Sequence, residues 1–173
     1  MLFRSNVSPV QFRSGTLALK IVAALSASGL PAHRLELEIT EAVLIRDDEA
    51  ALEILHQLRA IGVRIALDDF GTGYSSLSYL QRFPFDKIKI DRCFVTDIAK
   101  PSGSSGIVRA VVNIAAERHM TTTAEGVETL EQQDLLRTLG CTEMQGYLFS
   151  PPKPAAEIRQ LLSGHRAKTA AVA

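Results

Sequence analysis

The sequence alternates short β-type runs with amphipathic helical patterns, and this alternation restricts the fold more than any other feature of the chain. Two joints, "LRAIGVRIAL" and "LRTLGCTEMQ", are near copies in which a helix end, a glycine and a strand follow one another directly. Repeated units of this kind predict parallel strands connected by helices. The β-type runs are "RLELEIT" (34–40), "VRIALDD" (63–69), "FDKIKID" (85–91), "MTTTAEG" (120–126) and "CTEMQGYLF" (141–149), with a further run before Asn6.

Three segments between these runs carry helix signals. Residues 47–62 begin with acids, repeat leucine at helical spacing and end at Gly62, where a helix cap belongs. Residues 106–119 place apolar side chains on one helical face, and residues 129–140 begin with Thr129 and Gln132 at capping-box spacing. About six βα units follow from this pattern. They fit an open doubly wound sheet or a piece of a (β/α)8 barrel.

Composition excludes several classes of protein. The 173 residues are most simply one domain, and 19 acids balance 19 bases, so no net positive field attracts nucleic acid or an anionic membrane. No window is apolar enough to span a bilayer, and the N-terminus does not resemble a signal peptide. Cys93 and Cys141 lack metal-site spacing, so we expect reduced thiols in a cytoplasmic protein.

Polar residues recur where the predicted strands end, which is where parallel α/β folds collect functional side chains. Carboxylates gathered there cannot be buried together without a compensating charge, and a divalent cation supplies one. These residues are Asn6, Glu38, Glu41, Asp68, Asp69, Lys89, Asp91, Glu125 and Gln145.

The available ligands are all oxygen atoms, without a nearby His or Cys, and this favours Mg²⁺ or Mn²⁺ over zinc. The adjacent Asp68 and Asp69 suit a pair of cations, with one carboxylate bridging them, and such a pair suits displacement at phosphorus. The loop that follows is rich in glycine and hydroxyl groups that could approach a phosphate, although a plain turn explains Gly71 and Gly73 equally well.

The segments "LELEITE", "ALDDFGTGYSSL", "DKIKIDRCFV", "AEGVE" and "QGYLFSPP" resemble, in order, the signatures of the EAL domain family of bacterial cyclic di-GMP phosphodiesterases. The resemblance covers about residues 1–163, and we expect residues 164–173 to form a disordered tail. It implies a TIM-like barrel and a Mg²⁺- or Mn²⁺-dependent hydrolysis of cyclic di-GMP to linear pGpG.

The resemblance also implies roles for individual residues. The implied metal ligands are Asn6, Glu38, Asp68, Asp69 and Glu125. Glu125 corresponds to a proposed general base, and Lys89 to a lysine that orients the attacking water or a phosphate oxygen. The positions near the substrate are Glu128, Gln145 and Pro152; Gln145 also supports the metal waters, and Glu41 steadies the loop after the double aspartate.

Several of these residues also have a structural explanation. Lys89 could pair with Asp86 or Asp91 in a surface network. Glu128 suits a helix start, where an acid interacts favourably with the helix dipole. Glu41 could be purely structural, and Pro152 could simply end a strand.

The chain departs from the family in lacking the Glu-Ala-Leu signature, which supplies a metal ligand. The family's first two strands would lie before Met1, and a complete barrel takes about 250 residues. We therefore expect an incomplete barrel whose activity is weak or absent, with open edges that favour a homodimer or a complementing N-terminal segment. The alternative functions are an inactive cyclic di-GMP-binding or protein-interaction module and, less in keeping with the motif order, an unrelated Mg²⁺-dependent phosphate-ester enzyme.

Overall fold

A computed structural model of the chain describes residues 2–44, 48–71, 77–100 and 102–158. Within these residues six strands form one sheet in the order β1-β2-β3-β4-β5-β6, and every neighbouring pair is parallel. The order never reverses, whereas a doubly wound sheet reverses at its switch point. The topology is therefore that of a (β/α) barrel. The strands are β1 (Phe3–Asn6), β2 (Leu35–Thr40), β3 (Arg64–Phe70), β4 (Lys87–Ile90), β5 (Thr121–Ala124) and β6 (Glu143–Met144).

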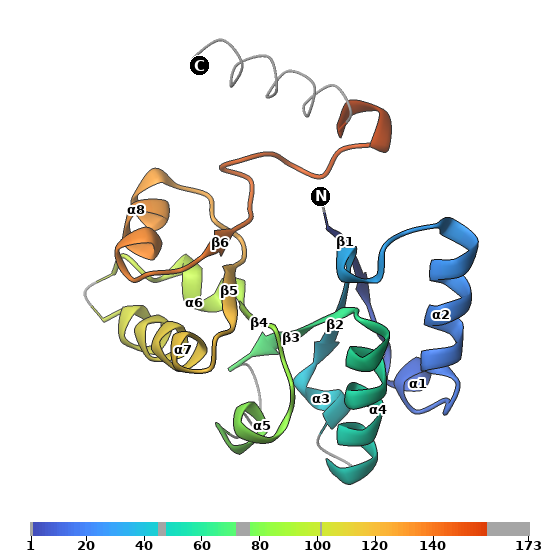
Figure 1. The fold of residues 1–173 in the computed structure, drawn as a ribbon. Helices are drawn as coiled ribbons and strands as arrows, with labels where there is room; N and C mark the ends of the chain where they lie inside the picture. Colours follow the sequence, from blue (N-terminus) through green and yellow to red (C-terminus); the bar gives the residue numbers. More distant parts are fainter. Residues whose placement is uncertain (1, 45–47, 72–76, 101, 159–173) are drawn as a thin grey trace.

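The sheet curls into an arc, with β1 and β6 at its two ends and helices around the outside (Figure 1). Six strands do not close this arc, so the structure is an incomplete barrel, as predicted. The helices are α1 (Pro9–Phe12), α2 (Leu17–Ser28), α3 (Glu41–Leu44), α4 (Asp48–Ile61), α5 (Leu77–Arg82), α6 (Arg92–Thr96), α7 (Ser105–Glu117) and α8 (Leu130–Thr138), with a short 3-10 helix at Ala32–Arg34.

Strand β2 shows why the sheet has two different faces. Leu37 and Ile39 belong to the hydrophobic core, whereas Glu36 and Glu38 alternate with them and make ion pairs with residues of other strands. Successive side chains of a strand point to opposite faces, so the two-residue alternation sends apolar groups toward the helices and charged groups toward the concave face.

Strand β4 repeats the pattern. Ile88 and Ile90 are buried in the core, and Lys87 and Lys89 lie on the concave face opposite the glutamates of β2. All four residues of this strand are buried, which is the expected environment of a central parallel strand.

The predicted helix boundaries are confirmed where capping signals were present. Thr129 and Gln132 form a reciprocal capping box at the start of α8. Gly62 and Gly140 follow α4 and α8 with φ angles of 93° and 88°, the left-handed conformation that glycine adopts without steric cost. Both near-copied joints therefore contain the left-handed glycine stop that their sequence indicates.

Two local predictions need correction. Helices α1, α2, α3, α5 and α6 were not located from the sequence, and the last strand was predicted over residues 141–149, whereas β6 contains only Glu143–Met144. At Gly146 the chain leaves the strand direction, because Gly146 packs directly on the backbone of Val127 and a turn follows from Gly146 to Phe149. A side chain at position 146 would meet that backbone, so the turn depends on glycine.

None of the helices in the described part of the chain combines the length and apolar character that a membrane crossing requires. The predicted phosphate-approaching loop (72–76) and the predicted disordered tail (164–173) lie outside the described residues.

Candidate functional site

The amine of Lys89 is the centre of the predicted site. Lys89 Nζ lies 2.9 Å from Glu38 Oε2, 2.9 Å from Asp68 Oδ1 and 2.8 Å from Glu125 Oε1. The four side chains are between 6% and 20% exposed, and we call them the Lys89 cluster. The structure therefore brings together three of the predicted metal ligands, and Lys89 pairs with them rather than with Asp86 or Asp91.

The cluster forms because three strands and the residue after a fourth contribute one side chain each. Glu38 comes from β2, Asp68 from β3 and Lys89 from β4, while Glu125 directly follows β5. Parallel strands end at the same edge of a sheet, so residues at equivalent positions near their carboxyl ends converge inside the curled sheet. Asp86 and Asp91 have other partners: Asp86 pairs with Arg59, and Asp91 caps α6.

Burial and neighbouring charge perturb the pKa values of this cluster. Burial alone would lower the pKa of Lys89, but hydrogen bonds to Glu125, Glu38 and Asp68 outweigh it, so the pKa is raised and the amine stays protonated. Burial raises the pKa of Glu125, Asp68 and Glu38 add to the rise, and Lys89 only partly opposes it. The carboxylates thus carry more negative charge than one lysine neutralises.

Asp69 reaches the same region through an irregularity in β3. The pairing of β3 with β4 shifts register between Leu67 and Phe70, and Asp69 has a φ of 56°. Regular alternation would direct Asp69 away from Asp68, and a bulge of this kind can redirect a side chain. Burial raises the pKa of Asp69, and the charges of Asp68 and Asp91 raise it further while Lys89 lowers it.

A pocket of about 590 Å³ adjoins the cluster at the carboxyl ends of β5 and β6. Gln145 Nε2 donates to Glu125 Oε1 at 2.8 Å, and both residues line this pocket. Glu128 and Pro152 line it as well, and Glu128 Oε1 lies 3.2 Å from Arg92 Nη2. All three residues predicted to lie near the substrate therefore border one pocket with Glu125.

Two predicted residues lie at the margin of this arrangement. Asn6, the last residue of β1, is exposed and pairs in strand register with Glu38. Glu41 is buried at the first position of α3, immediately after β2. The structure thus sets Asn6 beside a member of the cluster and Glu41 in the packed layer behind it.

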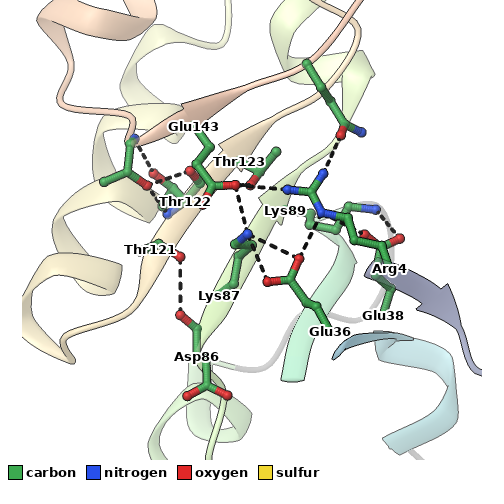
Figure 2. Close-up of polar contacts among 12 residues, drawn as sticks. Arg4, Glu36, Glu38, Asp86, Lys87, Lys89, Thr121, Thr122, Thr123 and Glu143 are labelled. Carbon is green, nitrogen blue, oxygen red and sulfur yellow. Dashed lines mark hydrogen bonds and ion pairs between the residues drawn. The ribbon is translucent and has the colours of Figure 1, made fainter. Parts of the chain in front are cut away.

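A second set of charged residues, which sequence reasoning missed, lies deeper on the concave face (Figure 2). Lys87 Nζ lies 2.9 Å from Glu36 Oε2 and 2.8 Å from Glu143 Oε2. Arg4 Nε lies 3.0 Å from Glu36 Oε1, and Arg4 Nη2 lies 3.0 Å from Glu143 Oε2. We call these four residues the Lys87 cluster. The alternation in "LELEI" and "KIKI" was a sufficient signal, because Glu36 and Lys87 share the face of Glu38 and Lys89.

The two clusters differ in charge balance. The Lys87 cluster contains two cations and two carboxylates, whereas the Lys89 cluster has three carboxylates around one ammonium, with Arg4 Nε of the Lys87 cluster 4.0 Å from Glu38 Oε1. Among the described residues no group of His, Cys, Asp and Glu side chains is already spaced to hold a metal ion, and Lys89 Nζ lies where the carboxylates converge. All-oxygen donors with excess negative charge are nevertheless what a hard divalent cation prefers, so these residues fit Mg²⁺ or Mn²⁺.

The fold and this site together define an incomplete parallel (β/α) barrel with an acidic site at the carboxyl ends of its strands. The chain belongs to the EAL domain family, whose sequence model matches residues 1–152. The chain spans about a fifth of the length of the curated relatives it matches.

Three relatives illustrate the match. The chain is 44% identical over 153 residues to MucR of Pseudomonas aeruginosa, a bifunctional diguanylate cyclase/cyclic di-GMP phosphodiesterase, covering 88% of this chain and 22% of MucR. The structure of the MucR phosphodiesterase in complex with cyclic di-GMP superposes with a TM-score of 0.86 at 43% identity, covering 91% of this chain and 64% of that one.

The EAL domain of Mycobacterium smegmatis DcpA superposes with a TM-score of 0.90 at 40% identity, covering 95% of this chain and 74% of that domain. BlrP1 of Klebsiella pneumoniae, solved as a manganese and cyclic di-GMP complex, superposes with a TM-score of 0.81 at 37% identity, covering 87% of this chain and 39% of BlrP1.

Proposed function

We propose that this chain carries the site of a cyclic di-GMP phosphodiesterase, which hydrolyses cyclic di-GMP to pGpG once the barrel is completed. The observation that carries the proposal is the convergence of Glu38, Asp68 and Glu125 on Lys89, next to a pocket of about 590 Å³. That volume lies within the range of about 300–1,000 Å³ typical of small-molecule sites. The named activity of MucR supports the choice of substrate.

Five residues would hold a pair of Mg²⁺ or Mn²⁺ ions: Asn6, Glu38, Asp68, Asp69 and Glu125. When bound, such ions stabilise the charge on the entering and leaving oxygens at phosphorus. The perturbed pKa values support this assignment, because burial and neighbouring carboxylates raise the pKa of both Asp69 and Glu125. Added positive charge would relieve that repulsion. Glu41, buried at the first position of α3, would steady the loop that follows Asp68 and Asp69.

Two side chains of the chain itself, Lys89 and Glu125, would act directly in the reaction. The Lys89 ammonium binds a phosphate oxygen or orients the attacking water, and Glu125 accepts a proton from that water as general base. A new oxygen–phosphorus bond forms, one phosphorus–O3′ bond breaks, and the departing 3′ oxygen takes up a proton. One of the two phosphodiester bonds of the ring is thereby opened, and the product is the linear dinucleotide.

The pocket beyond Glu125 would hold the rest of the dinucleotide. Gln145 fixes Glu125 through a 2.8 Å hydrogen bond, and Glu128 and Pro152 border the same space. Arg92 extends into this pocket from the start of α6 and supplies a positive charge for an anionic ligand. With cyclic di-GMP as its substrate, we propose that the domain acts in the bacterial cytoplasm.

Strand β1 offers a reason for weak activity in the chain by itself. Among the described residues β1 pairs on one side only, and all four of its residues are exposed, including Phe3 at 47%. A pocket of about 550 Å³ lies beside this edge, between β1 and the end of α2. We infer that a complementing N-terminal segment, which contains a Glu-Ala-Leu strand, adds a strand to β1.

The same open edge favours a second candidate function. A chain without the Glu-Ala-Leu strand could retain cyclic di-GMP binding, or an interaction with a protein partner, and lack hydrolysis. Chromatography of the products after incubation with cyclic di-GMP and Mn²⁺, together with calorimetric binding, separates the two functions. The phosphodiesterase function is supported if Asp68→Asn abolishes hydrolysis and Asp134→Asn, an exposed control on α8, retains it.

Completion of the barrel is tested separately. Fusing an N-terminal EAL-domain segment with the Glu-Ala-Leu strand ahead of Phe3 should raise pGpG formation well above that of the chain by itself. Light scattering distinguishes this from self-assembly: a homodimer that gains activity with concentration would favour a second copy of the chain as the complement. If the fused protein neither binds nor hydrolyses cyclic di-GMP, the proposed function is overturned.

A further inference from the structure

The guanidinium of Arg4 connects the two edges of the sheet across the concave face (Figure 2). Arg4 lies on β1, and its Nη2 donates to Glu143 Oε2 on β6 at 3.0 Å. Its Nη1 donates to Gln145 Oε1 at 2.8 Å, just beyond the end of β6. Strands β1 and β6 do not pair with each other, so this side chain makes the link that backbone hydrogen bonds do not.

The third nitrogen of Arg4 anchors it from the opposite side. Arg4 Nε lies 3.0 Å from Glu36 Oε1, and Glu36 is 1% exposed. The same nitrogen lies 4.0 Å from Glu38 Oε1, a longer and direct contact with the Lys89 cluster. A guanidinium presents its donors in a rigid plane, so fixing Nε to Glu36 also fixes the directions in which Nη1 and Nη2 point. Arg4 is therefore aimed at Gln145 by a buried carboxylate.

The chemistry of the two neighbours determines which way the Gln145 side chain faces. A guanidinium only donates hydrogen bonds, and Glu125 Oε1 acts as an acceptor, since the Lys89 ammonium also points at it. With Arg4 at Oε1, the amide nitrogen must face Glu125, and Gln145 Nε2 does donate to Glu125 Oε1 at 2.8 Å. Reversing the amide would set an oxygen against a carboxylate and an NH₂ group against a cation. Arg4 thus selects the orientation that binds Glu125.

Glu125 Oε1 also accepts from Lys89 Nζ at 2.8 Å, so this series of contacts ends in the Lys89 cluster. We propose that Arg4 is a positioning residue, which holds the carboxamide of Gln145 so that Glu125 stays in place for binding a divalent cation and for catalysis. The proposal rests on the proposed function for its consequence, because Glu125 is there a metal ligand and general base. No other described residue combines contacts to Glu36, Glu143 and Gln145.

The test compares Arg4→Lys, Gln145→Leu and the double variant. Lysine keeps the positive charge and loses the planar fork, so any change reports on positioning and not on charge. The matched control is Arg13→Lys, because Arg13 is an exposed arginine whose Nε donates to the backbone carbonyl of Pro9, away from both clusters. Unfolding in urea measures how far each variant alters overall stability.

Two readouts follow. The first is the side-chain NH₂ signals of Gln145 in ¹⁵N-labelled protein, identified by their absence in Gln145→Leu. Arg4→Lys should move them toward the positions of a free carboxamide, and Arg13→Lys should leave them unchanged. The second is Mn²⁺ affinity by calorimetry, which Arg4→Lys should weaken about tenfold, as for the loss of one hydrogen bond to a charged group.

The combined result decides the proposal. If Arg4 acts through Gln145, then Arg4→Lys has little further effect on Mn²⁺ affinity in the Gln145→Leu background. Equal weakening in both backgrounds would show a route independent of Gln145 and overturn the proposal, as would unchanged Gln145 signals in Arg4→Lys. If neither the unaltered chain nor the fused protein with the completed barrel binds Mn²⁺, the proposed function fails, and the Gln145 signals still decide whether Arg4 positions this amide.

Discussion

Lys87 Nζ on β4 lies 2.9 Å from Glu36 Oε2 on β2, and both side chains are only 1% exposed. This pair lies at the base of the concave face, where Arg4 and Glu143 complete a cluster with equal numbers of positive and negative groups. The layer nearer the carboxyl ends of the strands has an excess of carboxylates around Lys89. A balanced layer supports the barrel, and the unbalanced layer above it is where we propose that a cation binds.

Lys87→Met should lower the free energy of unfolding by about 3–5 kcal/mol, because it leaves the buried Glu36 without its ammonium partner. The double variant Glu36→Gln/Lys87→Met should recover much of this loss, since Arg4 and Glu143 then remain as a balanced pair. Urea unfolding of the single and double variants measures the coupling. Additive losses in the double variant would contradict the charge-balance explanation.

Lys89→Met should also destabilise the chain, by about 3 kcal/mol in the absence of divalent cations, because three converging carboxylates lose their shared ammonium. Adding Mn²⁺ should then raise the melting temperature more in this variant than in the unaltered chain, since the ion supplies the missing charge. Thermal unfolding with Mn²⁺ and with a chelator measures both effects. The control is Lys100→Met, a lysine that is 64% exposed. Equal Mn²⁺ responses in all three proteins would count against a cation site here.

Gly146→Ala should disturb the turn that holds Gln145. An added Cβ would lie 2.2 Å from the backbone oxygen of Val127, which has no flexible end to move aside. We expect the free energy of unfolding to fall by about 2 kcal/mol, in the range measured for overpacked sites. Gly106→Ala is the matched control, because a Cβ there meets no atom within 4 Å and alanine favours the helix. Similar stabilities of the two variants in urea would refute the steric argument.

Cys93 should react slowly with alkylating reagents despite its exposure. Although the residue is exposed, partial desolvation of its thiol and the nearby Asp91 carboxylate raise the pKa of Cys93 to about 11, from an ordinary value of 9.0. The reactive thiolate is the deprotonated form, so at pH 8 its population is about a hundredfold smaller than for an ordinary cysteine, and the alkylation rate should keep rising up to about pH 11.

The measurement is iodoacetamide alkylation against pH in a Cys141→Ser background, which leaves Cys93 as the reacting thiol. Asp91→Asn should lower the pKa and speed the reaction near pH 8, because it removes a negative charge and keeps an oxygen able to cap α6. A rate that levels off near pH 9 in the unaltered chain would contradict a raised pKa.

Much of the fold was predictable because its signals are local. The glycines at 62 and 140, the Thr129–Gln132 capping box and the alternating strands each depend on residues close in sequence, and all three predictions are confirmed. The shortening of β6 was not predictable in this way. It depends on contact between Gly146 and Val127, two residues that approach only when β5 and β6 pair.

The sequence by itself determined which side chains face the interior, because strand geometry makes every second residue share a face. The sequence alone therefore indicated that the acidic residues at the strand ends, which include Glu38, Asp68 and Glu125, lie together. Only the tertiary structure decided the partners: Lys89 joins these carboxylates rather than Asp86 or Asp91, and Arg4 reaches Glu143 across 139 positions of the chain. The physical reason is the curvature of the sheet, which brings opposite edges within reach of one side chain and is set by the packing of all the strands and helices together.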